Sequence, residues 1–332
     1  MSLPTTHQAA AIVEKGKPLS LITRKTPTPG PGEVLLKVQA IAFNPVDMAQ
    51  RDVGLFIAAY PAISGSDVAG TITLTGPGVS SVQIGDRVTA FASAFFAQGN
   101  PDYGATQEYV LVAETVLTPL PASWSFVEGC VLPMATFVAW SAWTYAGVPR
   151  EVDEGALKGE GVLVWGASSS MGAFGVQVAR LMGYTVYATA SVQHHGYIES
   201  LGAKRVFDYK AEDVVEQIVS AAKEDGLKMT KGMHAAGSEE GAVSKYGIAP
   251  IVDKEVKVPE GVETAFLTGP QPEERDEWLK WVFGTWLKEN LAKGRVVASP
   301  HIKVLDGGLA AANQALDNLK AGVSATKLAV EL

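Results

Sequence analysis

The stretch Gly161-Val-Leu-Val-Trp-Gly-Ala-Ser-Ser-Ser-Met-Gly-Ala-Phe-Gly-Val-Gln-Val-Ala-Arg-Leu-Met-Gly183 decides the fold of this chain. Its apolar run at residues 162–165 has the length and composition of a buried parallel strand. A turn of small residues follows, and apolar side chains then recur at helical spacing at Met171, Phe174, Val178 and Leu181. With a second strand expected over residues 185–191, the pattern predicts a βαβ unit whose turn and helix N-terminus bind an anion, here a pyrophosphate.

The glycine fingerprint of this turn is incomplete. Against G-x-G-x-x-G the three positions read Ala167, Ser169 and Gly172, so glycine occupies the last of them only. Alanine and serine are the smallest substitutes, and a serine hydroxyl can itself donate to a phosphate oxygen. A plain βα turn without a ligand is the alternative, because a motif is a hypothesis until its context supports it.

The end of the second strand indicates which nicotinamide cofactor is used. It reads Ala190-Ser-Val-Gln-His-His195, with no acidic residue before Glu199. An acid there would accept from the ribose 2′-hydroxyl of NAD and repel a 2′-phosphate, so its absence favours NADP. Ser191, protonated histidines and Tyr209, which follows a strand-like run at 205–208, can all donate at this corner. The alternative is that His194 and His195 form a solvated loop pair.

The bulk properties exclude several classes of protein. The 332 residues suffice for two domains, and 47% hydrophobic with 19% charged residues is ordinary for a globular protein. A net charge of −8 without a basic run argues against nucleic-acid binding. We expect no apolar segment of about 18 residues to cross a membrane. The N-terminus lacks the pattern of a signal peptide, so a cytoplasmic location is the default expectation.

The pattern along the rest of the chain predicts an inserted domain. Residues 9–125 alternate short β-type runs with turns, as in a β-barrel or sandwich. Helices are expected over 128–143, interrupted by Pro133, over 211–225 and over 273–293. In the helix expected at 211–225 the predicted inward-facing residues are Val214, Val215, Ile218 and Val219. In the helix expected at 273–293 the apolar residues are Trp278, Trp281, Val282 and Trp286. A strand at 327–332 ends the chain. A β-rich start and an α/β tail that returns to a strand favour one domain inserted into another.

Several motifs in order resemble the medium-chain dehydrogenase/reductase superfamily. They are Asn44-Pro-Val-Asp47, Tyr60-Pro-Ala-Ile-Ser-Gly-Ser-Asp-Val-Ala-Gly70, Gly85-Asp-Arg-Val88, Tyr103-Gly-Ala-Thr-Gln-Glu-Tyr109, Leu132-Pro-Met-Ala-Thr136 and Ser324-Ala-Thr-Lys-Leu328. Within it, the chain resembles the zinc-independent, ToxD-like branch that includes trans-acting enoyl reductases of polyketide assembly. The resemblance implies an α/β fold, with a GroES-like β-barrel domain at 1–126 and 297–332 and a Rossmann domain inserted at 127–296. It places the cofactor in the cleft between them.

The resemblance also implies roles for individual residues. The expected cofactor-binding residues are Asn44, Pro45, Val46 and Asp47 at the nicotinamide, Gly166, Ala167, Ser168, Ser169, Ser170, Met171 and Gly172 at the phosphates, Ser191, Val192, Gln193, His194 and Tyr209 at the adenosine 2′-phosphate, and Thr326 and Lys327 in the tail. The expected substrate-pocket residues are Leu132, Met134, Phe137, Trp278, Trp281 and Val282. Core packing is the alternative for the tryptophans. Several relatives carry a lysine two places after the motif aspartate, where this chain has Ala49.

A zinc site is not expected. Cys130 is the single cysteine, so the chain can form neither an internal disulfide nor a thiolate zinc cluster. No cysteine or histidine stands near Asn44–Asp47, where the resemblance places a first zinc ligand.

The first functional hypothesis is reduction of a conjugated C=C bond by NADPH, in an enone or enoyl thioester that is free or carrier-bound. Without a metal, hydrogen-bond donors must stabilise the negative charge on the carbonyl oxygen, and Tyr60 and Thr136 are the candidate catalytic donors. For Tyr60 the alternative is an aromatic side chain of the core or rim. The other hypotheses are a quinone or alkenal reductase and a redox-inactive, cofactor-binding partner of a synthase. Either a monomer or a homodimer is compatible with the sequence.

Overall fold

The computed structural model describes residues 3–153, 155–236, 246–248, 264–266 and 271–332. It divides into two compact units. The first unit comprises Met1–Met134, Asp276–Gly294 and His301–Leu332, and the second comprises Ala135–Arg275 and Arg295–Pro300. Against the expected boundaries, the tryptophan-rich segment Asp276–Gly294 packs with the first unit.

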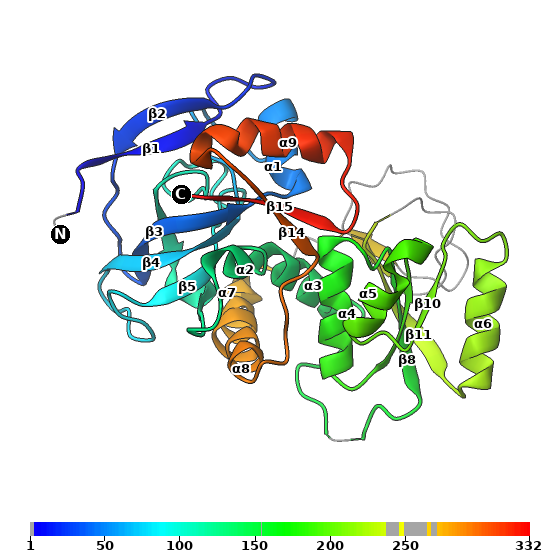
Figure 1. Ribbon diagram of the computed structural model, residues 1–332. Coiled ribbons are helices and arrows are strands. Elements are labelled where there is room, and N and C mark those ends of the chain that lie inside the picture. Colours follow the sequence, from blue (N-terminus) through cyan, green and yellow to red (C-terminus); the bar gives the residue numbers. More distant parts are fainter. Residues whose placement is uncertain (1–2, 154, 237–245, 249–263, 267–270) are drawn as a thin grey trace. The chain divides into compact units, whose positions relative to one another are not determined.

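The first unit is built on a seven-stranded sheet with the order β14-β15-β3-β4-β5-β7, and β6 pairs antiparallel with residues 33–37 of β3. The central strand β3 is a long apolar run in which seven of ten residues are buried. The strands are β1 (Thr6–Ala11) and β2 (Ser20–Lys25), which form a separate pair, and β3 (Glu33–Ala42), β4 (Asp67–Thr75), β5 (Arg87–Phe91), β6 (Tyr109–Ala113), β7 (Leu117–Pro119), β14 (His301–Leu305) and β15 (Thr326–Glu331) (Figure 1). The expected β-rich start is therefore confirmed.

The two ends of the chain share this sheet. Strand β15 pairs antiparallel with β3, with Ala329 opposite Ala42, and β14 pairs parallel with β15. The short helix η5 (Gly308–Ala311) and α9 (Ala312–Ala321) connect β14 to β15. Because the tail returns to strands formed by the first 120 residues, the second unit is an insertion in sequence, as the pattern predicts.

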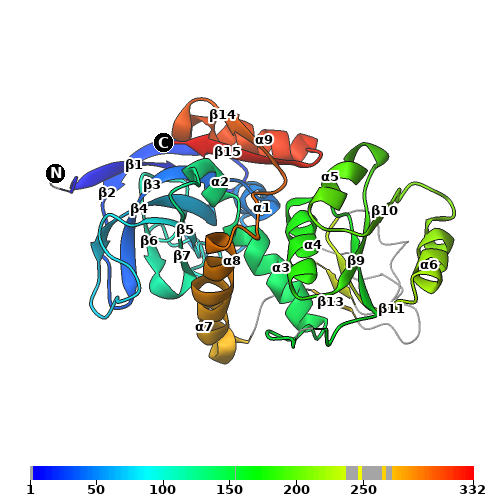
Figure 2. The ribbon, with the colours of Figure 1, turned by 60° about the horizontal axis from the view of Figure 1, so that its bottom comes forward.

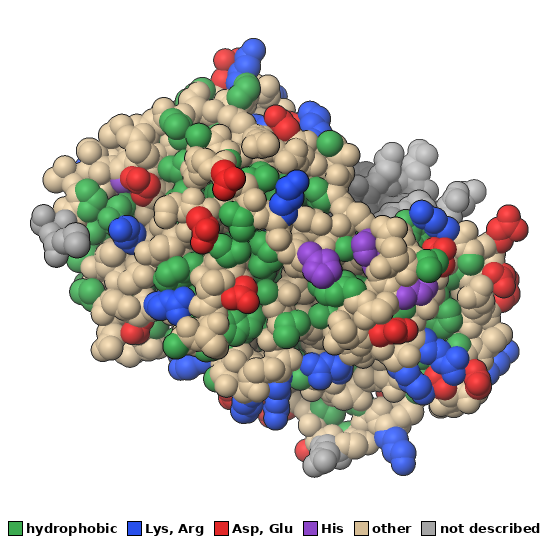
Figure 3. Space-filling view, in the orientation of Figure 1, with side chains coloured by type: hydrophobic (Ala, Val, Ile, Leu, Met, Phe, Trp, Pro, Cys, Tyr) green, Lys and Arg blue, Asp and Glu red, His purple; other side chains and the backbone are tan. Residues whose placement is uncertain are grey.

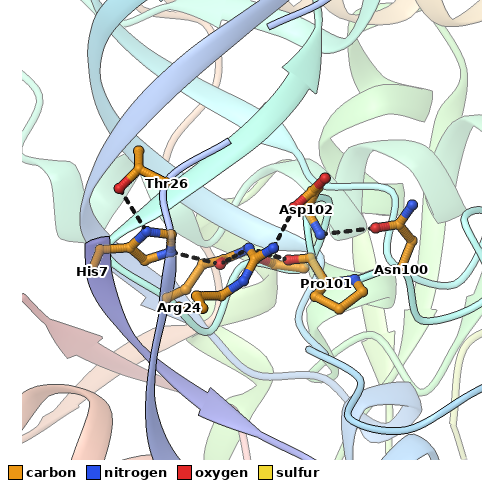
Figure 4. Close-up of polar contacts among 8 residues, drawn as sticks. His7, Arg24, Thr26, Asn100, Pro101 and Asp102 are labelled. Carbon is orange, nitrogen blue, oxygen red and sulfur yellow. Dashed lines mark hydrogen bonds and ion pairs between the residues drawn. The ribbon is translucent and has the colours of Figure 1, made fainter. Parts of the chain in front are cut away.

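A buried polar cluster ties β1 to the segment before β6. The His7 ring is 3% exposed, its Nδ1 lies 3.1 Å from Thr26 Oγ1, and its Nε2 lies 2.9 Å from Gln107 Oε1. Arg24 donates to the same Gln107 oxygen and to the Pro101 carbonyl, and it pairs with Asp102 (Figure 4). Burial lowers the pKa of His7. These bonds satisfy buried polar groups of the first unit and give the cluster a structural role.

The second unit contains a parallel sheet of six strands in the order β10-β9-β8-β11-β12-β13. Numbered from its first strand, this order is 3-2-1-4-5-6, that of a dinucleotide-binding Rossmann sheet. The strands are β8 (Glu160–Trp165), β9 (Thr185–Thr189), β10 (Arg205–Phe207), β11 (Lys228–His234), β12 (Tyr246–Ile248) and β13 (Thr264–Phe266) (Figure 2). The α/β fold class is confirmed.

Helices accompany this sheet. They are α4 (Ser170–Leu181), η2 (Val192–His194), α5 (His195–Ser200) and α6 (Val214–Glu224). Helix α6 packs through Val214 and Ile218 on Trp165 and Tyr187. The prediction that Val215 and Val219 also face inward is wrong, because they are 37% and 46% exposed, and the buried Ala221 and Ala222 complete the face.

The expected interruption of the helical segment at Pro133 is confirmed, and this proline begins the second of two helices. Helix α2 (Phe126–Cys130) ends before it, and α3 (Pro133–Tyr145) starts with it, at the position where the missing N–H costs nothing. The expectation that no segment is apolar enough to span a membrane is wrong by length and composition, because residues 126–145 pass that test. However, 78% of this window is buried inside the protein, and core helices pass the same test.

The tryptophan-rich segment is not one regular helix. Helix α7 (Pro272–Trp281) continues into a π-helical turn, η4 (Val282–Leu287), and then into α8 (Lys288–Ala292). The Thr118 hydroxyl donates to the Phe283 carbonyl at 2.8 Å, which gives that carbonyl a partner outside the helix. Trp278, Val282 and Trp286 are buried.

The visible surface carries charges of both signs. On the face shown in Figure 3, lysine and arginine side chains are interspersed with aspartate and glutamate side chains over both units. This mixture accords with the net charge of −8.

Candidate active site

The turn after β8 requires glycine at Gly166. Its φ is +78°, and a Cβ atom there would lie 2.4 Å from the carbonyl oxygen of Ala236 and 2.7 Å from its nitrogen. Ala236 follows β11, so the turn passes directly over the end of the neighbouring strand. The Thr189 hydroxyl accepts from the Gly166 N–H at 3.0 Å. The tight-turn role of a fingerprint glycine is therefore filled by Gly166, one place before the position occupied by Ala167.

Ser169 and Gly172 build the start of α4. The Ser169 hydroxyl accepts from the Gly172 N–H at 3.1 Å and donates to the Gly166 carbonyl at 2.9 Å, which makes it the N-cap and a brace of the turn. A Cβ atom on Gly172 would lie 2.5 Å from the Gly166 oxygen and 2.7 Å from the Ala167 Cα. The helix thus approaches the turn as closely as the third fingerprint glycine permits.

The same helix start has groups that fit a phosphate. The first-turn N–H groups of Ser170 and Met171 have no preceding carbonyl within the helix. The Ser170 hydroxyl is buried and has no hydrogen-bond partner among the described residues. An orphaned hydroxyl beside free N–H groups and the positive end of a 12-residue helix is a suitable donor set for a pyrophosphate.

The structure brings together the residues expected at the adenosine corner. Ser191 donates to the Tyr209 hydroxyl at 3.4 Å, so the ends of β9 and β10 meet there. Gln193 Nε2 lies 3.3 Å from His194 Nε2 in the exposed turn that follows, and Val192 is 65% exposed. The sequence reasoning missed Lys210, whose ammonium lies 5.7 Å from the centre of the Tyr209 ring. The position of Lys210 directly after Tyr209 in the sequence could have indicated that it lies at this corner.

In the first unit, the motif Asn44–Asp47 forms the start of helix α1 (Pro45–Val53). Asn44 is the N-cap residue, and its backbone N–H donates to Asp47 Oδ2 at 2.7 Å. Its side-chain amide lies between two buried charges. Oδ1 accepts from Lys327 Nζ at 2.5 Å, and Nδ2 donates to Asp67 Oδ2 at 2.9 Å.

Lys327 and Asp67 also pair directly. Their charged atoms lie 2.8 Å apart, with side chains 3% and 0% exposed. Asp67 Oδ1 accepts from the Met134 N–H at 2.6 Å, at the start of α3. The predicted cofactor residue Lys327 is therefore held by an ion pair inside the first unit. The sequence reasoning assigns no role to Asp67, although an acid at the start of an apolar strand is a signal for a buried pair.

Asp47 adds a second buried carboxyl to this cluster. It is fully buried, and its Oδ1 has no hydrogen-bond partner among the described residues. The pKa of Asp47 is raised to about 7, chiefly by burial and also by the neighbouring Asp67, whereas the Asn44 hydrogen bonds and Lys327 oppose the shift. One buried lysine thus faces two carboxyl groups.

The two candidate catalytic donors differ in exposure. Tyr60 is 40% exposed, and a Cβ atom on Gly54 would meet its hydroxyl at 2.7 Å, so this hydroxyl lies over the end of α1. Thr136 is fully buried in the first turns of α3, and its hydroxyl has no partner among the described residues. Either hydroxyl has the chemistry of a donor, and their roles remain predictions.

The remaining predicted residues are mainly buried. Leu132, Met134, Phe137, Trp278 and Val282 are at most 9% exposed, and Trp281 is half-buried. Thr326 donates to the Ser324 carbonyl at 2.8 Å. Core packing therefore accounts for the burial of the tryptophan helix, and a pocket role for these side chains remains a prediction.

The described residues contain no group of three or more histidine, cysteine, aspartate or glutamate side chains that could hold a metal ion. Cys130 is buried, and burial raises the pKa of its thiol well above the ordinary range. A thiol that resists ionisation is a poor zinc ligand.

Comparison with known proteins identifies the family. Residues 30–122 match the alcohol dehydrogenase GroES-like domain. The chain is 44% identical to the trans-enoyl reductase tndF of Aspergillus flavipes, over 98% of this chain and 99% of the relative. It is 47% identical to the trans-enoyl reductase tazE of Aspergillus terreus, over 67% of this chain and 74% of the relative. The solved structure of the CurK enoyl reductase shares the fold, with a TM-score of 0.74 at 21% identity, over 99% of both chains.

The fold, the helix start that suits a pyrophosphate and these relatives agree with one another. The chain belongs to the medium-chain dehydrogenase/reductase superfamily, in the group of the trans-enoyl reductases.

Proposed function

We propose that this protein reduces the conjugated C=C bond of an enoyl thioester or enone with NADPH and without zinc, as a separate partner of a polyketide-type synthase. The observation that carries the proposal is the donor set at the start of α4, in a chain whose relatives are trans-enoyl reductases. A bound nicotinamide cofactor supplies the hydride, and the protein has to bind it, orient the substrate and provide a proton.

The preference for NADPH is supported by the adenosine corner. The hydroxyls of Ser191 and Tyr209 are hydrogen-bond donors at this corner, and Lys210 adds a positive charge. No acidic side chain occurs at residues 190–195. A 2′-phosphate gains hydrogen bonds and charge attraction in such surroundings, whereas a 2′-hydroxyl gains less. We expect Lys210→Ala to weaken NADPH binding about 5- to 10-fold, while NADH binding stays unchanged. Lys204→Ala is the matched control, because Lys204 pairs with Asp225 instead.

The proposal of zinc-independent chemistry is supported by the residues of the motif segment. The side chains there are those of Asn44, Asp47 and Ser66, none of which offers zinc a thiolate or imidazole ligand. Cys130 is the single cysteine of the chain. Hydrogen-bond donors then stabilise the negative charge on the substrate carbonyl. Tyr60 and Thr136 are the proposed donors, and a proton from tyrosine or water completes the α-carbon.

The proposed substrate is a small acyl chain attached as a thioester to a carrier protein. The relatives tndF and tazE are trans-enoyl reductases, and a separate reductase of this kind meets its substrate on another protein. A quinone or alkenal reductase with free substrates is the second candidate, because the fold and the cofactor site are the same for both.

The test is turnover with matched substrates. NADPH oxidation is followed with a carrier-bound enoyl thioester, with its free N-acetylcysteamine analogue and with a quinone, before and after treatment with a strong chelator. We expect the carrier-bound substrate to be reduced fastest and chelation to have no effect. Faster reduction of the quinone would favour the second candidate. Loss of activity on chelation, restored by zinc, would contradict the metal-free mechanism.

A further inference from the structure

A small pocket opens on the first unit beside the tryptophan-rich segment. It has a volume of about 180 Å³ and lies between the loop after β4, the segment at η1 (Glu114–Val116) and β7, and the turn η4. Two exposed lysines line it, Lys280 from α7 and Lys288 from α8. Neither has a hydrogen bond or ion pair with another described residue. Two positive charges therefore face a hollow that has room for more than a single water molecule.

The carboxylate that lines this pocket is already bound. Glu114 Oε1 accepts from the backbone N–H groups of Ser80 and Ser81, at 2.7 and 2.5 Å. Burial would raise the pKa of Glu114, but these hydrogen bonds and the charge of Lys280 lower it overall. The glutamate thus fixes the loop after β4. With two lysines against one glutamate, the lining keeps a net positive charge.

Gly284 adds space to the pocket. It lies in the π-helical turn η4, between the two lysines in sequence. A Cβ atom there would meet only Lys280 Cγ, at 3.9 Å, so packing does not require a glycine at this position. Glycine inside a helix destabilises it relative to alanine, and π-helical turns within α-helices occur frequently at functional sites. Both features favour access for a ligand over the stability of the helix.

The rest of the lining has a polar side and an apolar side. Thr115 and Thr285 add hydroxyl groups, and Val82, Leu117 and Pro119 add apolar surface. Ammonium and hydroxyl groups are suitable donors to the several oxygens of a phosphate. A ligand in which a phosphate is joined to a branched hydrocarbon group matches both sides of the pocket.

We propose that this pocket binds the phosphate of the phosphopantetheine arm that carries the acyl chain of the substrate. The inference rests on the proposed function, in which the substrate is attached to a carrier protein. In this arm the phosphate is followed by a carbon that bears two methyl groups, so an anion and an apolar group are adjacent. Inorganic phosphate would leave the apolar side of the pocket unused, and a carboxylate on a protein surface has fewer oxygens for the hydroxyl donors.

The pocket is connected to the expected substrate site within the first unit. Phe283 precedes Gly284, and its ring stacks on that of Phe91 with the ring centres 6.0 Å apart. Phe91 lies opposite Asp67 in the pairing of β5 with β4, and Asp67 accepts from the N–H of Met134, an expected substrate-pocket residue. Three contacts thus lead from the pocket to Met134. This arrangement suits an arm that has its phosphate at one end and its thioester at the other.

The experiment compares two crotonyl thioesters that differ by one phosphate. Crotonyl-pantetheine and crotonyl-4′-phosphopantetheine are reduced with NADPH at low ionic strength, and the ratio of their kcat/KM values is measured in each variant. We expect the wild-type protein to prefer the phosphorylated thioester by about 5- to 10-fold, because two charge-assisted contacts form at exposed positions. Lys280→Ala and Lys288→Ala should each reduce this preference to about two- to threefold, and the double variant should abolish it.

Matched variants test the charge and the shape of the pocket. Lys293→Ala should keep the full preference, because Lys293 pairs with Glu289 at 3.0 Å and does not line the pocket. Gly284→Leu should remove the preference by filling the pocket, whereas Gly284→Ala should retain it. Added salt should lower the preference of the wild-type protein. Equal kcat/KM values for the two thioesters in the wild-type protein, or a preference that persists in the double variant, would overturn the inference.

The remaining outcomes separate this inference from the proposed function. A loss in the lysine variants with a carrier-bound crotonyl thioester, absent with the free phosphopantetheine thioester, would assign the lysines to the protein surface of the carrier and overturn the inference. If the wild-type protein reduced neither the free nor the carrier-bound thioesters, the proposed function would fail. The pocket is then tested by titration with 4′-phosphopantetheine and with pantetheine, and equal affinities for the two would overturn the inference.

Discussion

The two candidate sites of this protein differ in the chemical groups that form them. In the second unit, the turn from Gly166 to Gly172 consists mainly of backbone and small side chains, and the hydroxyl of Ser170 has no hydrogen-bond partner among the described residues. In the first unit, the start of α1 consists of charged and amide side chains that are almost fully buried and bonded to one another. The first arrangement offers backbone donors to a ligand, and the second orients one side chain through several others.

This difference decides how each site responds to substitution. A site made of backbone depends on steric space, so adding a single carbon can destroy it. A site made of buried charged side chains depends on the balance between positive and negative groups. Changing one charge therefore alters the protonation and orientation of its neighbours without changing the shape of the site. The following variants use this contrast, in order of decreasing expected effect.

Gly166→Ala is expected to have the largest effect. The new Cβ atom would lie 2.4 Å from the Ala236 oxygen at a φ of +78°, so backbone must move. We expect a loss of about 2–4 kcal/mol in unfolding free energy and of NADPH binding. Gly183→Ala is the matched control, because Gly183 has a φ of +95° and open space around it. Equal losses in the two variants, by thermal unfolding, would show that backbone strain rather than the close approach matters.

Asp47→Asn tests the charge balance of the first unit through pH. The pKa of Asp47 is about 7 in the folded protein against an ordinary 3.8. Between these values the unfolded chain has released the proton that the folded protein retains, so this group makes stability fall as pH rises, until about pH 7. We expect the variant to gain in melting temperature relative to wild type from pH 5 to pH 8.

Asp52→Asn provides a control of opposite sign. Hydrogen bonds from Arg51 and Lys320 lower the pKa of Asp52, so its contribution to stability is present at neutral pH and is lost on acidification. The deficit of this variant should shrink as pH falls. Parallel pH profiles for wild type and Asp47→Asn would contradict the buried, proton-holding carboxyl.

Ser169→Ala is expected to have the smallest effect on stability, about 1 kcal/mol, the usual value of a helix cap. Ser125→Ala removes the equivalent cap of α2 in the first unit, where Ser125 accepts from the Glu128 N–H at 3.1 Å. Both variants should lose similar stability, but Ser169→Ala alone should weaken NADPH binding severalfold. A cofactor affinity unchanged in both would make Ser169 a cap and nothing more.

The sequence predicted the second unit better than the details of the first. Apolar runs and small-residue turns are local signals, so β8, the turn and α4 were expected within one or two residues of their observed bounds. The inserted arrangement followed from a chain that begins and ends with strands. The division of the chain could not be read in the same way, because Asp276–Gly294 packs with the first unit through contacts distant in sequence.

The buried contacts among Asn44, Asp67 and Lys327 show why part of the site could not be predicted. Asn44, Asp67 and Lys327 are separated by up to 283 residues, and only the pairing of β15 with β3 brings the tail to the start of α1. Lys327 was expected to contact the cofactor because a lysine near the end of the chain matched a family segment. Its burial and its ion pair depend on tertiary packing, which leaves no periodic trace in the sequence.

The central claim is reduction of a C=C bond by hydride from NADPH, and isotope transfer tests it most directly. The protein is incubated with a carrier-bound enoyl thioester and NADPH that carries deuterium at the transferred position of C4. The account predicts a saturated thioester with one deuterium at the β-carbon and one solvent proton at the α-carbon, detected by mass spectrometry and NMR. An allylic alcohol or aldehyde that retains the C=C bond, or unlabelled saturated product, would contradict it.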